Sequence, residues 1–105
     1  MNGVTAIANI LKMEGVDFVA VMPTNPLIEA IAIAGIRPIV CRQERTGIHM
    51  ADGFSRAGGG IGTALMVPGP GLLNASAAIG TAYSASSPIM VVCGQIERDL
   101  IGVDR

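Results

Sequence analysis

The fold of this chain is constrained most by four short, continuous apolar runs. Each run is followed or preceded by a helix-like stretch. The apolar runs are residues 18–22, 37–41, 62–67 and 88–93. The helix-like stretches are residues 5–14, 26–34, 45–57 and 72–84. A short run without polar alternation is typical of a strand that is buried on both faces. The sequence therefore predicts an α/β fold.

Strands that alternate with helices are joined by right-handed crossovers and form a parallel sheet with helices on both faces. Ligands of such sheets bind at the carboxyl ends of the strands. In this chain, residues 22–25, 41–44 and 67–71 follow predicted strands at that edge. We expect any binding or catalytic site to be built from these loops. The length of 105 residues suits a single small domain.

The composition excludes several classes of function. Seven Lys and Arg against eight Asp and Glu give a net charge of −1, without a basic stripe for nucleic acid. No apolar run approaches the roughly 18 residues of a membrane span, and no secretory signal pattern is visible, so we expect a cytoplasmic protein. Only 14% of the residues are charged, against about 25% in a typical domain. This shortage predicts either an obligate oligomer or a piece of a larger protein.

Several polar residues are expected to be structural. Cys41 and Cys93 end apolar runs without a neighbouring ligand, so we expect two buried thiols and no metal site, with a disulfide as the alternative. His49 is expected to face solvent or an interface. Asp52 and Arg56, four residues apart on a predicted helix, are expected to form a surface ion pair.

Glu44 is the most informative polar residue, because it follows a predicted buried strand and opens a helix. Steps of three and four residues place it on the apolar stripe of that helix. The stripe consists of Glu44, Gly47, Ile48, Ala51, Phe54 and Gly58. Withdrawal from water favours the protonated form of a carboxyl group unless a cation or several donors compensate, which suits proton-relay chemistry. The alternative is that Glu44 only complements the helix dipole.

The loop of Gly69, Pro70 and Gly71 lies between a predicted strand and a predicted helix. Glycine lets a backbone approach a ligand closely or adopt positive φ. The spacing to Asn74 misses the dinucleotide fingerprint, and no acidic residue ends the next strand, so we do not expect NAD binding. The helix that follows is rich in small residues, which suits close packing in the core or at a subunit interface.

Residues 43–56, with the sequence QERTGIHMADGFSR, resemble the glutamate helix of thiamin-diphosphate-dependent enzymes of the acetolactate synthase and 2-oxo-acid decarboxylase group. Residues 69–74 and 82–95 are similar to the next segment of that family, in the same order and spacing. The resemblance covers nearly the whole chain. It implies the thiamin-diphosphate-binding fold and, within it, the N-terminal pyrimidine-binding domain.

The resemblance also implies roles for individual residues. Glu44 aligns with the catalytic glutamate, which hydrogen-bonds a ring nitrogen of the cofactor's aminopyrimidine and thereby helps to remove the thiazolium proton. The other positions that align with cofactor-binding residues are Gly69, Pro70, Gly71 and Asn74. The positions that align with substrate-proximal residues are Pro23, Thr24, Asn25 and Gln43. Gln43 stands where many members of the family have His, and Thr24-Asn25 departs from the common Gly-Gly or Gly-Asp.

The family's signature for diphosphate and Mg²⁺, Gly-Asp-Gly followed by Asn-Asn, does not occur in residues 1–105. The resemblance therefore implies an incomplete pyrimidine-binding domain, with Mg²⁺ held by a domain or chain that is absent here. It implies a homo-oligomer, a dimer or tetramer, whose substrate is a small 2-oxo acid. The alternative is a non-catalytic assembly or regulatory module that keeps this fold. In isolation we expect the chain to self-associate.

Overall fold

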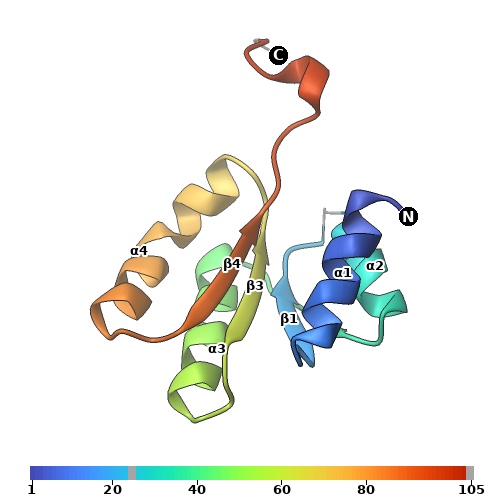
Figure 1. The fold of residues 1–105 in the computed structure, drawn as a ribbon. Coiled ribbons are helices and arrows are strands. Elements are labelled where there is room, and N and C mark those ends of the chain that lie inside the picture. Colours follow the sequence, from blue (N-terminus) through green and yellow to red (C-terminus); the bar gives the residue numbers. More distant parts are fainter. Residues whose placement is uncertain (24–25, 104–105) are drawn as a thin grey trace.

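The computed structural model describes residues 1–23 and 26–103 (Figure 1). Its centre is a parallel sheet of four strands in the order β2-β1-β3-β4. The strands are β1 (Phe18–Val21), β2 (Arg37–Val40), β3 (Gly62–Met66) and β4 (Ile89–Cys93). The helices are α1 (Gly3–Met13), α2 (Leu27–Ile33), α3 (Glu44–Arg56) and α4 (Pro70–Ser84). The predicted α/β fold with a parallel sheet is confirmed.

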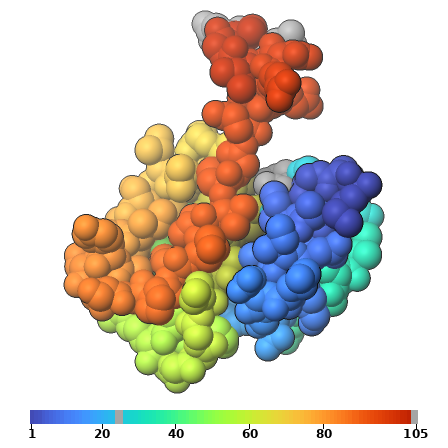
Figure 2. Space-filling model, viewed as in Figure 1, coloured from blue at the N-terminus to red at the C-terminus, as the bar shows by residue number. Residues whose placement is uncertain are grey.

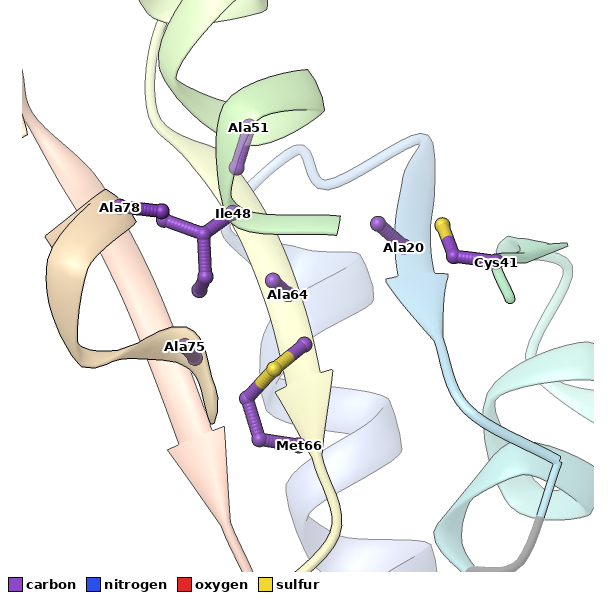
Figure 3. Packing of buried hydrophobic residues seen from close by; sticks show 8 residues of the cluster. All are labelled: Ala20, Cys41, Ile48, Ala51, Ala64, Met66, Ala75 and Ala78. Carbon is purple, nitrogen blue, oxygen red and sulfur yellow. The ribbon is translucent and has the colours of Figure 1, made fainter. Parts of the chain in front are cut away.

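Helices cover both faces of the sheet, as predicted, because successive strand residues point to opposite sides. In β1, Val19 and Val21 pack beneath α1 and α2, whereas Ala20 packs beneath α3 and α4. We call these the α1/α2 face and the α3/α4 face. The α1/α2 face buries Ala8, Val19, Val21, Leu27, Ile31, Ile36 and Leu65. The α3/α4 face buries Ala20, Cys41, Ile48, Ala51, Ala64, Met66, Ala75 and Ala78 (Figure 3).

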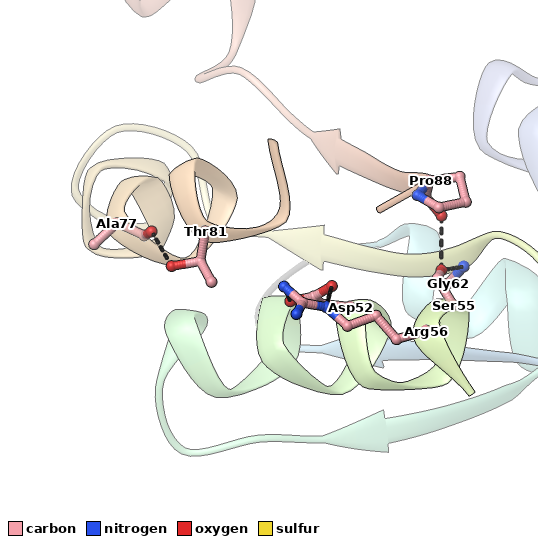
Figure 4. A network of polar contacts seen from close by, with 7 residues as sticks. All are labelled: Asp52, Ser55, Arg56, Gly62, Ala77, Thr81 and Pro88. Carbon is pink, nitrogen blue, oxygen red and sulfur yellow. Dashed lines mark hydrogen bonds and ion pairs between the residues drawn. The ribbon is translucent and has the colours of Figure 1, made fainter. Parts of the chain in front are cut away.

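The C-terminal half of α3 is fixed against the start of two strands (Figure 4). Ser55 Oγ accepts a hydrogen bond from the Gly62 backbone N–H at 2.8 Å and donates one to the Pro88 carbonyl at 2.7 Å. Gly62 itself has no room for a side chain, because a Cβ there would overlap the Ala51 carbonyl oxygen. Helix α3 therefore approaches β3 backbone to backbone, which determines where its N-terminus lies.

Two helices begin earlier than predicted. Helix α1 begins at Gly3 because Asn2 Oδ1 accepts a hydrogen bond from the Thr5 backbone N–H at 3.0 Å. Helix α4 begins at Pro70, whose fixed φ suits a first turn, after Gly69 with a φ of 68°. The C-terminal segment after β4 contains one 3₁₀ turn, Arg98–Leu100, and leaves the body of the molecule (Figures 1 and 2).

The prediction of a surface ion pair is wrong for one of its partners. Asp52 and Arg56 do pair, with Nε–Oδ1 and Nη2–Oδ2 distances of 2.8 and 3.0 Å (Figure 4), but Asp52 is only 5% exposed. The hydrogen bond from Arg56 lowers the pKa of Asp52. His49 is exposed, as expected. The buried face of α3 thus continues from Ala51 to Asp52, whereas Phe54 is half-buried.

Candidate functional site

The predicted site residues that the structure describes lie in loops and first helical turns at the carboxyl edge of the sheet. Glu44 is the first residue of α3, directly after the extended Gln43, and its side chain is 7% exposed. The Gln43 side chain is exposed and makes no capping hydrogen bond. A carboxyl group in the first turn also complements the helix dipole. Burial on the sheet side and a helix N-terminus therefore act on the same group.

The first turns of α4 contact Glu44 directly. Asn74 Nδ2 donates a hydrogen bond to Glu44 Oε1 at 3.2 Å. Gly71 is buried beside it, and a Cβ at Gly71 would lie 3.5 and 3.6 Å from Glu44 Cγ and Cδ, and 2.7 Å from Val67 Cβ. Gly71 therefore lets the start of α4 pack closely against Val67, at a position that is also in van der Waals reach of Glu44. The structure thus brings together Glu44, Gly71 and Asn74 from the N-terminal turns of two helices.

The remaining predicted residues are more exposed. Gly69 adopts φ 68° and ψ −115°, a conformation that side chains rarely permit, and it precedes the exposed Pro70. Their backbone is therefore open to a ligand that approaches the edge. Pro23 is exposed after β1, and Thr24 and Asn25 lie outside the described residues. Among the described residues, neither Pro23 nor Gln43 makes a side-chain hydrogen bond to Glu44.

The hydrogen-bonding groups at this edge suit a ligand with a nitrogen-containing ring. A carboxyl group exchanges hydrogen bonds with a ring nitrogen in either protonation state. Among the described residues, Asn74 is the only hydrogen-bond partner of the Glu44 carboxyl, and it occupies Oε1. Oε2 is therefore available to a ligand. The exposed Gly69 has no side chain, and a Cβ there would meet no atom within 4 Å, so its backbone is open to a flat ring.

Other chemistry receives less support from the described residues. Within residues 1–23 and 26–103, no three His, Cys, Asp or Glu side chains gather closely enough to hold a metal ion. In the same part of the chain, no helix is long and apolar enough to cross a membrane. Cys41 and Cys93 are both free thiols, and Cys93 is only half-buried, contrary to prediction. Burial raises the pKa of the Cys41 thiol, whose Sγ lies 3.5 Å from Met50 Sδ.

A parallel α/β domain with a buried carboxyl group at the carboxyl edge of its sheet is typical of a cofactor-binding enzyme domain. The family model described as "Thiamine pyrophosphate enzyme, N-terminal TPP binding domain" matches residues 1–104, and the chain belongs to this family. The family resemblance predicted from the sequence is confirmed.

Relatives with named activities share about a third of the aligned residues with this chain. The acetolactate synthase large subunit of Haemophilus influenzae is 35% identical over 108 residues, which cover 99% of this chain and 19% of that protein. A probable 2-ketoarginine decarboxylase of Pseudomonas aeruginosa is 37% identical over 90 residues, which cover 83% of this chain and 16% of that protein. The chain thus spans less than a fifth of the length of these relatives.

A solved structure has the same fold. The match to the crystal structure of benzoylformate decarboxylase from Polynucleobacter necessarius covers 100% of this chain and 20% of that chain, with a TM-score of 0.82. The sequence identity is 23%, so this likeness concerns the fold alone. The match confirms that the sheet and its helices have the arrangement found in a larger enzyme.

Proposed function

We propose that this chain supplies the pyrimidine-binding part of a thiamin-diphosphate-dependent lyase or transferase, acetolactate synthase-like or decarboxylase-like, and that Glu44 activates the cofactor's aminopyrimidine. The observation that carries the proposal is the buried carboxyl of Glu44, which Asn74 holds at the carboxyl edge of the sheet. Family membership supports the cofactor. The activity named for the 2-ketoarginine decarboxylase supports a substrate of the 2-oxo-acid class.

The residues of this chain divide the work at the cofactor. Thiamin diphosphate, when bound, supplies the electron sink for reactions at a 2-oxo carbon. Glu44 shares a proton with the pyrimidine ring at its available oxygen, in surroundings from which water is largely withdrawn. Gly69, Pro70 and Gly71 present backbone to the ring. Pro23 and Gln43, with Thr24 and Asn25 outside the described residues, are assigned to the side from which substrate approaches.

We assign the diphosphate and Mg²⁺ to another domain or subunit, which covers surface that this chain leaves open. Helix α4 contains no charged residue, yet Leu73 is 72% and Tyr83 is 85% exposed. An apolar helix surface of this kind is typical of an interface. It supports assembly into a homo-oligomer, a dimer or tetramer, in which the cofactor lies between this chain and its diphosphate-binding partner.

The substitution Glu44→Gln in the cofactor-loaded enzyme tests the role of Glu44. Glutamine keeps the size of the side chain but cannot exchange a proton, so we expect exchange of the cofactor's C2 proton, followed by NMR, to fall about 100-fold or more. Glu29→Gln is the matched control, because Glu29 also lies in the first turn of a helix but is exposed. Unchanged exchange in the Glu44 variant would reject the proposed role.

The exposed α4 surface also favours a second candidate, a non-catalytic assembly or regulatory module that keeps this fold. The two candidates differ in whether the assembled protein binds thiamin diphosphate. Isothermal titration calorimetry of the assembled protein with thiamin diphosphate and Mg²⁺ separates them. Saturable binding supports the enzyme, and assembly without binding supports the module.

A further inference from the structure

We infer that Asn74 is a positioning residue for Glu44: its side-chain amide holds Oε1, so that Oε2 is the oxygen that meets the pyrimidine. The inference rests on the proposed function and specifies which atom of Glu44 acts. It differs from the role that the alignment gives Asn74, which is that of a cofactor-binding residue.

The geometry of α4 explains how Asn74 reaches Glu44. Gly71 and Asn74 are three residues apart, so they lie on the same side of the helix. Gly71 has no room for a Cβ beside Val67, so the first turn of α4 packs closely there and lies next to Glu44. Asn74, on the same side of the helix, donates a 3.2 Å hydrogen bond from Nδ2 to Glu44 Oε1. One face of α4 therefore lies beside the carboxyl group and fixes its rotation.

The chemistry of an amide makes this contact directional. The NH₂ group of asparagine only donates, whereas an ionised carboxylate only accepts. The bond from Asn74 therefore engages an oxygen that carries no proton, and a proton held by Glu44 is on Oε2. One hydrogen bond suffices to select one rotation of a terminal carboxyl torsion, because that torsion has only weak preferences of its own.

Within the described residues, Glu44 has no cationic partner that could orient it instead. The ion pair that the structure describes joins Asp52 and Arg56 about two to three turns further along α3. The orientation of Glu44 therefore depends on Asn74. The outer side of Asn74 is exposed, so direct contact with the cofactor is the rival role that an experiment must separate.

The first test uses the assembled protein without cofactor. NMR of the Asn74 side-chain amide should show one of its two protons exchanging with solvent roughly tenfold more slowly than the other, because only one is bound to Oε1. Truncation of the acceptor by Glu44→Ala should remove this inequality. Ser76→Ala, which alters an exposed α4 hydroxyl bonded to the Leu73 carbonyl, should leave it unchanged. Equal exchange of both protons in the unmodified chain overturns the inference.

The second test is a double-mutant cycle in the loaded enzyme. Asn74→Ala should slow exchange of the cofactor's C2 proton roughly tenfold to a hundredfold, while the affinity for thiamin diphosphate changes less than about twofold. Asn74→Asp should slow it further, because a second carboxylate then faces Glu44. In the Ser76→Ala variant, the cofactor's C2 proton should exchange at the rate of the unmodified enzyme.

The cycle separates positioning from direct binding and from failure of the proposed function. If Asn74 acts through Glu44, Asn74→Ala adds nothing once Glu44 is replaced by Gln. If the two effects multiply, or if cofactor affinity falls with Asn74→Ala, Asn74 binds the cofactor itself and the positioning role is rejected. If the cofactor's C2 proton exchanges at the original rate in the Glu44→Gln variant, the proposed function fails and the positioning role fails with it.

Discussion

The two faces of the sheet are built by the same strands but packed with different side chains. The α1/α2 face is filled mainly by branched aliphatic residues, among them Val19, Ile31 and Leu65. The α3/α4 face is filled mainly by alanines and sulfur-containing side chains, with Ile48 as its largest aliphatic residue (Figure 3). The face that carries Glu44 therefore has small residues where its counterpart has bulky ones.

The small residues of the α3/α4 face let backbones approach one another. Gly62 lies against the Ala51 carbonyl, and Gly71 lies against Val67 next to Glu44. On the α1/α2 face, burial of larger side chains contributes more of the apolar area removed from water, at about 25 cal/mol per Å². We infer that one face chiefly stabilises the domain, while the other positions the site. The two faces should therefore respond oppositely to changes in side-chain size.

Truncation on the α1/α2 face should produce the largest loss of stability. Ile31 is fully buried, so Ile31→Ala removes apolar contacts and leaves a cavity, and we expect the free energy of unfolding to fall by about 2–5 kcal/mol. Urea denaturation measures the change. Ile33→Ala in the same helix is the control, because Ile33 is 81% exposed and should change stability by less than about 0.5 kcal/mol. Similar losses in both variants would contradict the assignment of this face.

Enlargement on the α3/α4 face should have the next largest effect. Gly62→Ala places a methyl group on the Ala51 carbonyl, so β3 and α3 must separate, at a cost of about 3 kcal/mol. The matched control is Gly53→Ala in α3, where a Cβ meets no atom within 4 Å and helix propensity should raise stability by about 0.5–1 kcal/mol. Urea denaturation of both variants is the measurement. A neutral Gly62→Ala would show that this face tolerates expansion.

The sequence predicts the fold and the location of the candidate site well, because both depend on local patterns. The apolar runs mark all four strands to within about two residues, and the spacing of the next helix places Glu44 on a buried stripe. The sequence does not reveal that Asn74 bonds to Glu44. That contact joins residues 30 positions apart and depends on the angle at which two helices pack.

The burial of Asp52 could not be predicted for a similar reason. A spacing of four residues indicates an ion pair with Arg56, but whether one partner is buried depends on how α3 packs in the fold. The earlier start of α4 depends on the conformation of Gly69, which the sequence permits without requiring it. Local chemistry was therefore predictable, whereas contacts between elements required the structure.

The same comparison predicts where the acid sensitivity of the fold originates. Asp52, a buried carboxyl group on α3, is paired with Arg56 on the same helix. Because the hydrogen bond from Arg56 lowers the pKa of Asp52 in the folded state, folding favours the ionised form. Its contribution to stability is present above the unfolded-state value of about 3.9 and is lost as the pH falls through the lower folded-state pKa.

Asp52→Asn should therefore destabilise the chain at pH 7 and change the pH dependence of unfolding. The gap in unfolding free energy between the original chain and this variant should be constant above about pH 5 and shrink as the pH falls below about 4. Urea denaturation across this range measures the gap. Glu29→Gln, which changes an exposed carboxyl group on the α1/α2 side, should show a much smaller gap. If the gap in unfolding free energy does not narrow in acid, the pH dependence of stability does not come from Asp52. The two faces of the sheet would then not differ in acid sensitivity.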